Sequence, residues 1–294
     1  MLRRNLLIVM VFAMLAGAVV AEDSIKPYHV MVANDDGIDA PGIAAVVAVL
    51  AADPSYRVTV VAPAEQQSVT SHSHVTRREV PVRPHAPMAG AAAWSVGGTP
   101  ASAVRIGLTG LLVDDVPDLV VSGINRGENN GLGAWTSGTV GAAREAVLVG
   151  VPSIALSLQL DWDDPRPDFE TAARWCKPII DAVRKDGLPD RVFLNVNVPR
   201  DTLAIKGYRL ARMGLTPPAV ARFDVMSEED GITWYRSRWR PAPTAEAGTD
   251  TRAMLDGWVA IAPMGLDQTD YGSFPMIQGL EEAAVPVVVS VGVP

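Results

Sequence analysis

The sequence predicts an α/β fold in which a mostly parallel sheet lies between two layers of helices. Short apolar runs recur along the chain and alternate with segments whose apolar residues follow a helical period. Strands that are apolar on both faces are typical of parallel sheets covered by helices on both sides. The composition changes after about residue 205, where Arg, Trp, Pro and Gly become frequent. This change predicts that β-hairpin extensions follow the α/β core.

The expected elements alternate in the order strand then helix. Strands are expected at residues 29–33, 57–62, 118–122, 153–158 and 192–198. Helices are expected at residues 41–50, 139–149 and 168–187. Pro41 suits the first position of a helix, with Asp39 as its expected cap, and Gly150 suits the position just past a helix end. This alternation is that of a Rossmann-like, three-layer αβα fold.

The single cysteine, Cys176, excludes an internal disulfide. It lies on the apolar face of the helix expected at residues 168–187. A cysteine on such a face is expected to be a buried structural thiol rather than a nucleophile.

The C-terminal part offers short candidate strands, such as residues 232–236 and 258–262, and an expected exposed loop at residues 241–250. Too few apolar positions occur there for an independent core. We therefore expect one domain with a removable leader. Its parts are a signal peptide at residues 1–21, a Rossmann-like core at 22–204, and extensions for subunit contact at 205–294.

Residues 1–21 have the features of a cleaved secretory signal. Arg3 and Arg4 form a basic start, residues 6–20 are almost wholly apolar, and residues 19–21 are small or modest in size. The apolar run is shorter than the roughly 20 residues of a comfortable membrane span, and an uncleaved anchor is the alternative. We expect a secreted protein, periplasmic in a Gram-negative source, with no stable membrane association after cleavage.

The acidic balance of the chain disfavours nucleic acid as a partner. The net charge is −8, and removal of residues 1–21 takes away two arginines and no acid, which makes it −10. The one basic aromatic run, residues 234–240, is more simply a hairpin at a subunit contact or the rim of a pocket. An anionic substrate would require a metal ion or backbone amides to offset the repulsion.

Oxygen-bearing side chains follow three of the expected strands. Asp35 and Asp36 come directly after the first strand, Ser68 follows the second, and Asn125 follows the strand at residues 118–122. Because the carboxyl ends of neighbouring parallel strands meet at one edge of a sheet, we expect these side chains to converge. Oxygen ligands without His or Cys favour Mg, Mn or Ca over zinc. The sequence therefore predicts one divalent metal ion per subunit, with a plain Asp-Gly turn as the alternative for the carboxylates.

A second signal lies at residues 136–139, directly before the helix expected at residues 139–149. Backbone N–H groups at a helix start, joined by the hydroxyls of Ser137 and Thr139, form an anion site. The alternative is a plain helix cap. The anion site is favoured because Ser137 stands twelve residues after Asn125, at the same edge of the sheet.

Two histidines, His72 and His74, lie in a polar loop with Ser68, Ser71 and Ser73. A serine hydrolase is disfavoured because no G-x-S-x-G elbow follows a strand. The histidines are more simply surface or pocket-lining groups. Contact between His72 and the substrate is a hypothesis.

Several motifs occur in a characteristic order along the chain. They are Ala33-Asn34-Asp35-Asp36-Gly37, Ala62-Pro63 through Ser68, Ser122 through Asn129, Ser137-Gly138-Thr139-Val140, Asn195 through Pro199, Gly248-Thr249-Asp250 and Asp267-Gln268-Thr269. Together they resemble the survival protein E (SurE) family of metal-dependent nucleotidases and acid phosphatases. The resemblance covers nearly the whole chain after residue 21.

The resemblance implies that Asp35, Asp36, Ser68 and Asn125 coordinate the divalent ion. It also implies hydrolysis of phosphate monoesters, such as nucleoside 5′- and 3′-monophosphates, and a homodimer or homotetramer joined through the C-terminal extensions. The expected reaction is in-line attack by a metal-activated water, and attack on phosphorus by one Asp is the chemical alternative.

The expected roles divide into two groups. Asp35, Asp36 and Asn125 are the expected catalytic residues. The expected phosphate- and substrate-binding residues are Asn34, Asn129, Ser137, Gly138, Thr139 and His72. A secreted module that binds nucleotide or metal with little or no turnover is the alternative function.

Three positions depart from the pattern of the family. Val69 stands where a glycine is common, His72 where an amide is common, and Ser102 where the G-T-P-x-D stretch has its acid. The metal ligands are intact, so these departures bear on substrate preference more than on activity.

Overall fold

The fold comes from a computed structural model of the 294-residue chain. It describes residues 26–161, 166–215, 220–239 and 244–278. The expected signal peptide at residues 1–21 lies outside the described residues. Within them, no helix has both the length and the apolar character that a bilayer crossing requires.

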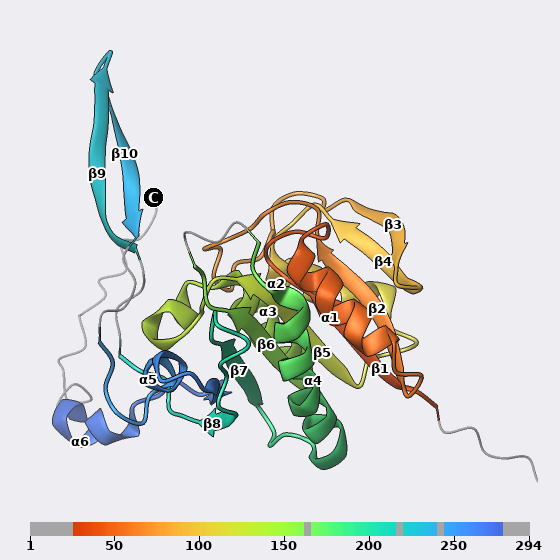
Figure 1. The fold of residues 1–294 in the computed structure, drawn as a ribbon. Coiled ribbons are helices and arrows are strands. Elements are labelled where there is room, and N and C mark those ends of the chain that lie inside the picture. The colour runs from red at the N-terminus through yellow and green to blue at the C-terminus, as the bar shows by residue number, and fades with distance from the viewer. Residues whose placement is uncertain (1–25, 162–165, 216–219, 240–243, 279–294) are drawn as a thin grey trace, which may run out of the picture.

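A nine-stranded sheet forms the centre of the molecule, in the order β3-β4-β2-β1-β5-β6-β7-β11-β8 (Figure 1). Its strands are β1 (Tyr28–Ala33), β2 (Tyr56–Pro63), β3 (Val82–Met88), β4 (Ala91–Val96), β5 (Leu119–Arg126), β6 (Ser153–Leu158), β7 (Val192–Val198), β8 (Tyr208–Leu210) and β11 (Val259–Gly265). The pairings β3–β4 and β7–β11 are antiparallel, and the other pairings of this sheet are parallel. The predicted α/β fold with a mostly parallel sheet is confirmed.

Helices cover both faces of the sheet. The helices are α1 (Pro41–Ala51), α2 (Pro100–Ile106), α3 (Gly138–Val149), α4 (Phe169–Asp186), α5 (Asp250–Leu255) and α6 (Phe274–Ile277), with short helical turns at Gly107–Leu111, Gly131–Trp135 and Tyr271–Ser273. The apolar sides of α1 and α4 pack in one core cluster, and α2 and α3 contribute to another that includes Met31 and Ala33 of β1. Since alternate residues of β1 face opposite ways, the strand contributes to both layers.

Most of the predicted elements of the core occur at or within a few residues of their expected bounds. The cap expected for α1 is wrong, because the N-cap position is Ala40 and no side chain caps it. The exposed carboxylate of Asp39 instead accepts a hydrogen bond of 3.1 Å from His85 Nε2 on β3. The predicted burial of Cys176 is confirmed, and burial raises the pKa of its thiol to about 12.

The sequence did not predict β3, β4 and α2. Two prolines, Pro84 and Pro87, interrupt β3, which is tolerated because β3 lies at the edge of the sheet. Strand β4 consists largely of alanine, which has a weak strand preference. Strand β5 is longer than expected and continues through Asn125, which therefore lies on the strand and not in the loop beyond it.

The C-terminal part is more closely joined to the core than hairpin extensions alone would be. The hairpin of β9 (Val220–Glu229) and β10 (Ile232–Trp239) projects from the body (Figure 1). However, β11 and β8 extend the central sheet, so the strand expected at 258–262 does not belong to a hairpin. The loop expected at residues 241–250 ends in a buried residue, Asp250, which starts α5. Residues 241–243 lie outside the described part.

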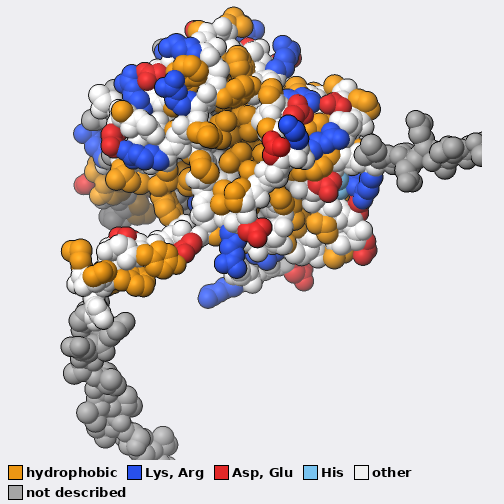
Figure 2. Space-filling model, turned by 90° about the horizontal axis from the view of Figure 1, so that it is seen from below, with side chains coloured by type: hydrophobic (Ala, Val, Ile, Leu, Met, Phe, Trp, Pro, Cys, Tyr) orange, Lys and Arg blue, Asp and Glu red, His pale blue; other side chains and the backbone are white. Residues whose placement is uncertain are grey.

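The last described segment carries exposed apolar side chains. Tyr271, Phe274, Met276 and Ile277 are all exposed. Figure 2, a view from below, shows hydrophobic side chains along this extended segment. The hairpin exposes apolar side chains as well, among them Phe223 and Trp234.

Candidate metal and phosphate site

Two adjacent carboxylates, Asp35 and Asp36, lie where β1 ends, between β2 and β5. A tight turn follows, in which Asn34 Nδ2 donates a hydrogen bond of 2.7 Å to the carbonyl of Gly37. Gly37 has φ +96°, a conformation that glycine adopts without steric cost. The side chain of Asn34 therefore stabilises the turn, and its Oδ1 is buried without a hydrogen-bond partner.

Asp35 is buried against the start of α3. Thr139 Oγ1 donates a hydrogen bond to Asp35 Oδ1. A Cβ atom at Gly138 would lie only 2.9 Å from Asp35 Oδ2, so the helix start approaches this carboxylate as closely as a glycine permits. Burial raises the pKa of Asp35 to about 7, the charge of Asp36 adds to the rise, and the hydrogen bond from Thr139 opposes it. A buried carboxylate of this kind is stabilised in its ionised form by a bound cation.

Asp36 is half-buried and connects the three loops at this edge of the sheet. Its Oδ2 accepts a hydrogen bond of 2.8 Å from the backbone N–H of Arg126. Its Oδ1 accepts one of 3.1 Å from Gln66 Nε2, and Gln66 Oε1 accepts a hydrogen bond of 3.2 Å from Ser68 Oγ. The expected convergence of the loops after β1, β2 and β5 is confirmed.

The amide of Asn125 is oriented by the loop that follows it. Its Nδ2 donates a hydrogen bond of 2.8 Å to the carbonyl of Gly127. The oxygen is then the remaining polar atom of the amide, and oxygen is the atom that a hard cation requires. Ser68, in contrast, is exposed.

A cleft of about 500 Å³ opens beside Asp36. It lies between the turn after β1, the loop after β2, and the end of β5. Its lining includes Asp36, Gly37, Gln66, Arg126 and Phe169. One carboxylate of the pair thus faces a space that a small molecule could enter, and the other is buried behind it.

The start of α3 is a helix cap that lies against the Asp35 carboxylate. Ser137 is the N-cap, and its Oγ accepts a hydrogen bond of 3.1 Å from Val140 N–H. The plain-cap alternative therefore holds for the Ser137 hydroxyl, and the Thr139 hydroxyl is used by Asp35. The N–H groups of the first helical turn, at Gly138 and Thr139, have no carbonyl partner within the helix. The Thr139 N–H, like its hydroxyl, interacts with the Asp35 carboxylate, so the Gly138 N–H is the group of this pair that remains suited to an anion.

The side chain of Asn129 joins β6 to the start of α3, where its Nδ2 lies 3.5 Å from Thr139 Oγ1. Its Nδ2 donates a hydrogen bond of 2.9 Å to Ser157 Oγ on β6. Its backbone N–H and carbonyl are bound by the side chains of Asn197 and Asn195, each at 2.7 Å. The buried asparagines of β7 thus hold the backbone of Asn129 in place, a contact that the sequence indicated only through a family motif.

Comparison with known proteins identifies the family. The model of the family described as "Survival protein SurE" matches residues 30–218. The chain belongs to the SurE family. It is 40% identical to 5′-nucleotidase SurE 1 of Thermus thermophilus, over 88% of this chain and 100% of that one. It is 39% identical to 5′-nucleotidase SurE of Desulfatibacillum aliphaticivorans, over 83% of this chain and 94% of that one.

The fold agrees with a solved member of the SurE family. The crystal structure of the SurE protein from Aquifex aeolicus matches this chain with a TM-score of 0.72 and 34% sequence identity. The match covers 86% of this chain and 99% of that chain. The central sheet and its layers of helices are therefore those of the family.

The departures from the SurE motif lie on the loop between β2 and β3, which carries Val69 and His72, and on α2, where Ser102 contacts that loop. Val69, where the motif commonly has glycine, adopts φ +63°, a conformation that is strained for a β-branched residue. Ser102 Oγ, where the motif commonly has an acid, accepts a hydrogen bond of 2.9 Å from Val75 N–H and so holds the end of the loop. Both residues act on the conformation of this loop.

His72 is paired with a residue that the sequence did not indicate. His72 and His74 contact Glu145 on α3, whose side chain is fully buried. Arg105 Nε on α2 contacts the same carboxylate. Burial acts to raise the pKa of Glu145, but the hydrogen bonds from His72 and Arg105 outweigh it and hold the pKa below its usual value. The signal available in the sequence was that Glu145 is the only acid in an alanine-rich helix, where a buried acid requires a partner.

The loop packs directly on α3 at Gly141. A Cβ atom at this position would lie 2.2 Å from the carbonyl oxygen of Ser71, which is backbone and cannot rotate away. We expect Gly141→Ala to lower the free energy of unfolding by about 1–3 kcal/mol, although alanine is the better helix former. Urea unfolding followed by circular dichroism measures the change.

The matched control is Gly133→Ala, because a Cβ atom at Gly133 would meet nothing within 4 Å. We expect this variant to be as stable as the wild type or slightly more stable. Equal stability of the two variants would contradict the close contact at Gly141.

Proposed function

We propose that the protein is a divalent-metal-dependent phosphomonoesterase that hydrolyses nucleoside monophosphates to nucleoside and phosphate. The observation that carries this proposal is the meeting of the buried Asp35, the cleft-facing Asp36 and the start of α3 at one edge of the sheet. Membership of a family whose relatives are named 5′-nucleotidase supports the same substrate class.

The residues present fit a hard divalent cation. Asp35 and Asp36 offer carboxylate oxygens, Asn125 offers an amide oxygen, and Ser68 offers a hydroxyl from the adjoining loop. Mg²⁺, Mn²⁺ and Ca²⁺ prefer such oxygen donors. When bound, the ion would polarise a phosphate oxygen and lower the pKa of a water molecule.

The protein's own groups bind and orient the substrate. The Gly138 N–H at the start of α3 binds the phosphate and stabilises negative charge that develops on it, and the Thr139 N–H helps to hold Asp35. Thr139 Oγ1 holds Asp35, and the Arg126 N–H holds Asp36, so both carboxylates keep their orientation. The nucleoside extends into the cleft, where Phe169 and the stem of Arg126 offer apolar surface.

The test is release of inorganic phosphate by the purified protein. Nucleoside 5′- and 3′-monophosphates and p-nitrophenyl phosphate are assayed with Mg²⁺, Mn²⁺ or Ca²⁺, and again after treatment with EDTA. We expect turnover that EDTA abolishes and added metal restores. Nucleotide binding without phosphate release under any of these metals would overturn the proposal in favour of a binding module.

We also propose that the protein is an exported homo-oligomer, a dimer or a tetramer. The exposed apolar side chains on the β9–β10 hairpin and on the segment before residue 279 support association through the C-terminal part. The apolar residues 6–20 after Arg3 and Arg4 support export. Light scattering on the purified protein tests the first point, because a monomeric mass would overturn it. Cell fractionation tests the second.

A further inference from the structure

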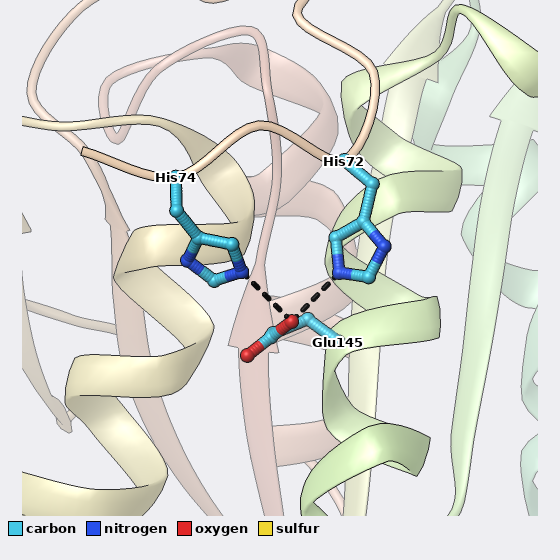
Figure 3. A group of neighbouring side chains, drawn as sticks. All are labelled: His72, His74 and Glu145. Carbon is cyan, nitrogen blue, oxygen red and sulfur yellow. Dashed lines mark hydrogen bonds and ion pairs between the residues drawn. The ribbon is translucent and has the colours of Figure 1, made fainter. Parts of the chain in front are cut away.

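A second group of metal-ligating side chains lies apart from the Asp35–Asp36 pair. His72 Nε2 and His74 Nε2 lie 2.7 and 3.0 Å from the same oxygen, Oε2, of Glu145. The three candidate ligand atoms all lie within 4.8 Å of one another. Figure 3 shows both imidazole rings pointing from their loop toward the carboxylate on α3.

The carboxylate is held in place for such a role. The Glu145 side chain has 0% exposure, and Arg105 Nε donates a hydrogen bond to its other oxygen, Oε1. An outer partner of this kind fixes the orientation of a ligating carboxylate and leaves one oxygen for the metal.

The loop that carries the histidines is fixed before, between and after them, the last by the hydrogen bond of 2.9 Å from Val75 N–H to Ser102 Oγ. Before His72, Ser71 N–H and Ser71 Oγ donate hydrogen bonds of 3.0 and 2.6 Å to the carbonyls of Thr136 and Trp135. Beyond His72, Thr99 Oγ1 donates a hydrogen bond of 2.6 Å to the carbonyl of Ser73. The two imidazoles are therefore presented to Glu145 by a backbone that is already in position, which lowers the entropic cost of binding a metal.

We propose that His72, His74 and Glu145 bind a second metal ion, of the zinc class, which differs in chemistry from the hard cation proposed at Asp35 and Asp36. Two imidazole nitrogens and one carboxylate oxygen are a ligand set that zinc takes in proteins, with a water in the fourth position. The His72 and His74 side chains are 20% and 30% exposed, so solvent reaches the site.

The two distances from histidine nitrogen to carboxylate oxygen require little movement. Zinc lies about 2.0–2.2 Å from each such ligand, so neighbouring ligand atoms in a tetrahedral site are roughly 3.3 Å apart. The observed separations of 2.7 and 3.0 Å widen by a few tenths of an ångström to reach that value. In the metal-free protein both Nε2 atoms donate protons to Glu145, and metal binding replaces those protons.

A zinc ion at this position would join the loop after β2 to α3. These are the two elements that carry Ser68 and the phosphate-binding helix start. The ion would therefore restrain the loop between β2 and β3 without contacting substrate. This inference stands independently of the proposed nucleotidase activity, because it concerns other residues and a different class of metal.

Cobalt(II), a coloured substitute for zinc, provides the test. The purified protein is stripped with EDTA and titrated with Co²⁺, and then Zn²⁺ is added in competition. We expect an intense visible absorption band at one equivalent of Co²⁺ that Zn²⁺ displaces. We expect His74→Gln to weaken Zn²⁺ binding at least tenfold, and Glu145→Gln to do the same if it folds.

Two control variants separate this site from others. His85→Gln removes an imidazole on β3 that pairs with Asp39, and should leave Zn²⁺ affinity unchanged. Asp36→Asn should remove nucleotidase turnover but keep the Co²⁺ band. The proposal would be overturned if the Co²⁺ band survived in His74→Gln and disappeared in Asp36→Asn. It would also be overturned if the wild type gave no band that Zn²⁺ displaces. Neither outcome would affect the nucleotidase proposal.

Discussion

Replacing Asp36 with Asn is expected to lower kcat/KM for a nucleoside monophosphate by about 10³-fold or more. Asp36 is the member of the carboxylate pair that lines the cleft, so its charge acts on both the cation and the reacting phosphate. The change keeps the size of the side chain, which favours retention of the fold. Initial rates of phosphate release at saturating Mn²⁺ or Mg²⁺ measure the effect.

The control for this variant is Asp114→Asn. Asp114 is an exposed carboxylate in the turn that precedes β5, at the opposite end of the sheet from Asp36. It changes the net charge by the same amount and should leave the rate within a factor of two. If Asp36→Asn retained a tenth of the wild-type activity or more, Asp36 would not be a ligand of the essential cation.

Replacing Asp35 with Asn is expected to stabilise the metal-free protein at pH 8. Burial raises the pKa of Asp35 from 3.8 to about 7 in the folded state. Because the folded state binds this proton more tightly than the unfolded state does, protonation of Asp35 contributes to the free energy of unfolding. This contribution is fully present below pH 3.8 and is lost as the pH rises through 7. The loss above pH 7 is on the order of 4 kcal/mol. An Asn side chain carries no charge, so the variant does not lose this stability at high pH, and its amide oxygen still accepts the hydrogen bond from Thr139.

The measurement is thermal unfolding of both proteins in EDTA between pH 4 and pH 8. The difference in melting temperature in favour of Asp35→Asn should be small at pH 4 and should grow toward pH 8. Added Mg²⁺ at pH 8 should raise the melting temperature of the wild type and not that of the variant, because the ion binds the ionised carboxylate. A difference that does not change with pH would contradict the assignment of the shift to Asp35.

The sequence predicted the helices and strands whose apolar pattern is visible within a single stretch of residues. The apolar period of α4 reflects one buried helical face, and Cys176 lies on it with no exposure. Strand β6 occurs at its predicted residues because a continuous apolar run can be buried only within a covered sheet. The meeting of Asp36 with the loops after β2 and β5 was predictable as well, since parallel strands bring their carboxyl ends together.

Other features depended on contacts between residues distant in sequence. Strand β11 pairs with β7 in the central sheet, although its sequence equally suited a hairpin. Asp39 has the chemistry of a helix cap, yet it lies one residue before the N-cap, Ala40, and contacts His85 on β3. For β11, a local preference of about 1 kcal/mol is outweighed by pairing in the central sheet. For Asp39, the residue at which the helix starts decides the outcome.

The sequence by itself determined the alternation of strands and helices in the core apart from β3, β4 and α2, the place of Asp35 and Asp36 at the end of the first strand, and the resemblance to the SurE family. These follow from local periodicity and from motifs in order. Only the tertiary structure decided that Asp35 is buried, that Thr139 and Gly138 enclose it, and that His72 and His74 face Glu145. Burial and the pairing of charges arise when separate elements pack together, and no single stretch of sequence carries that information.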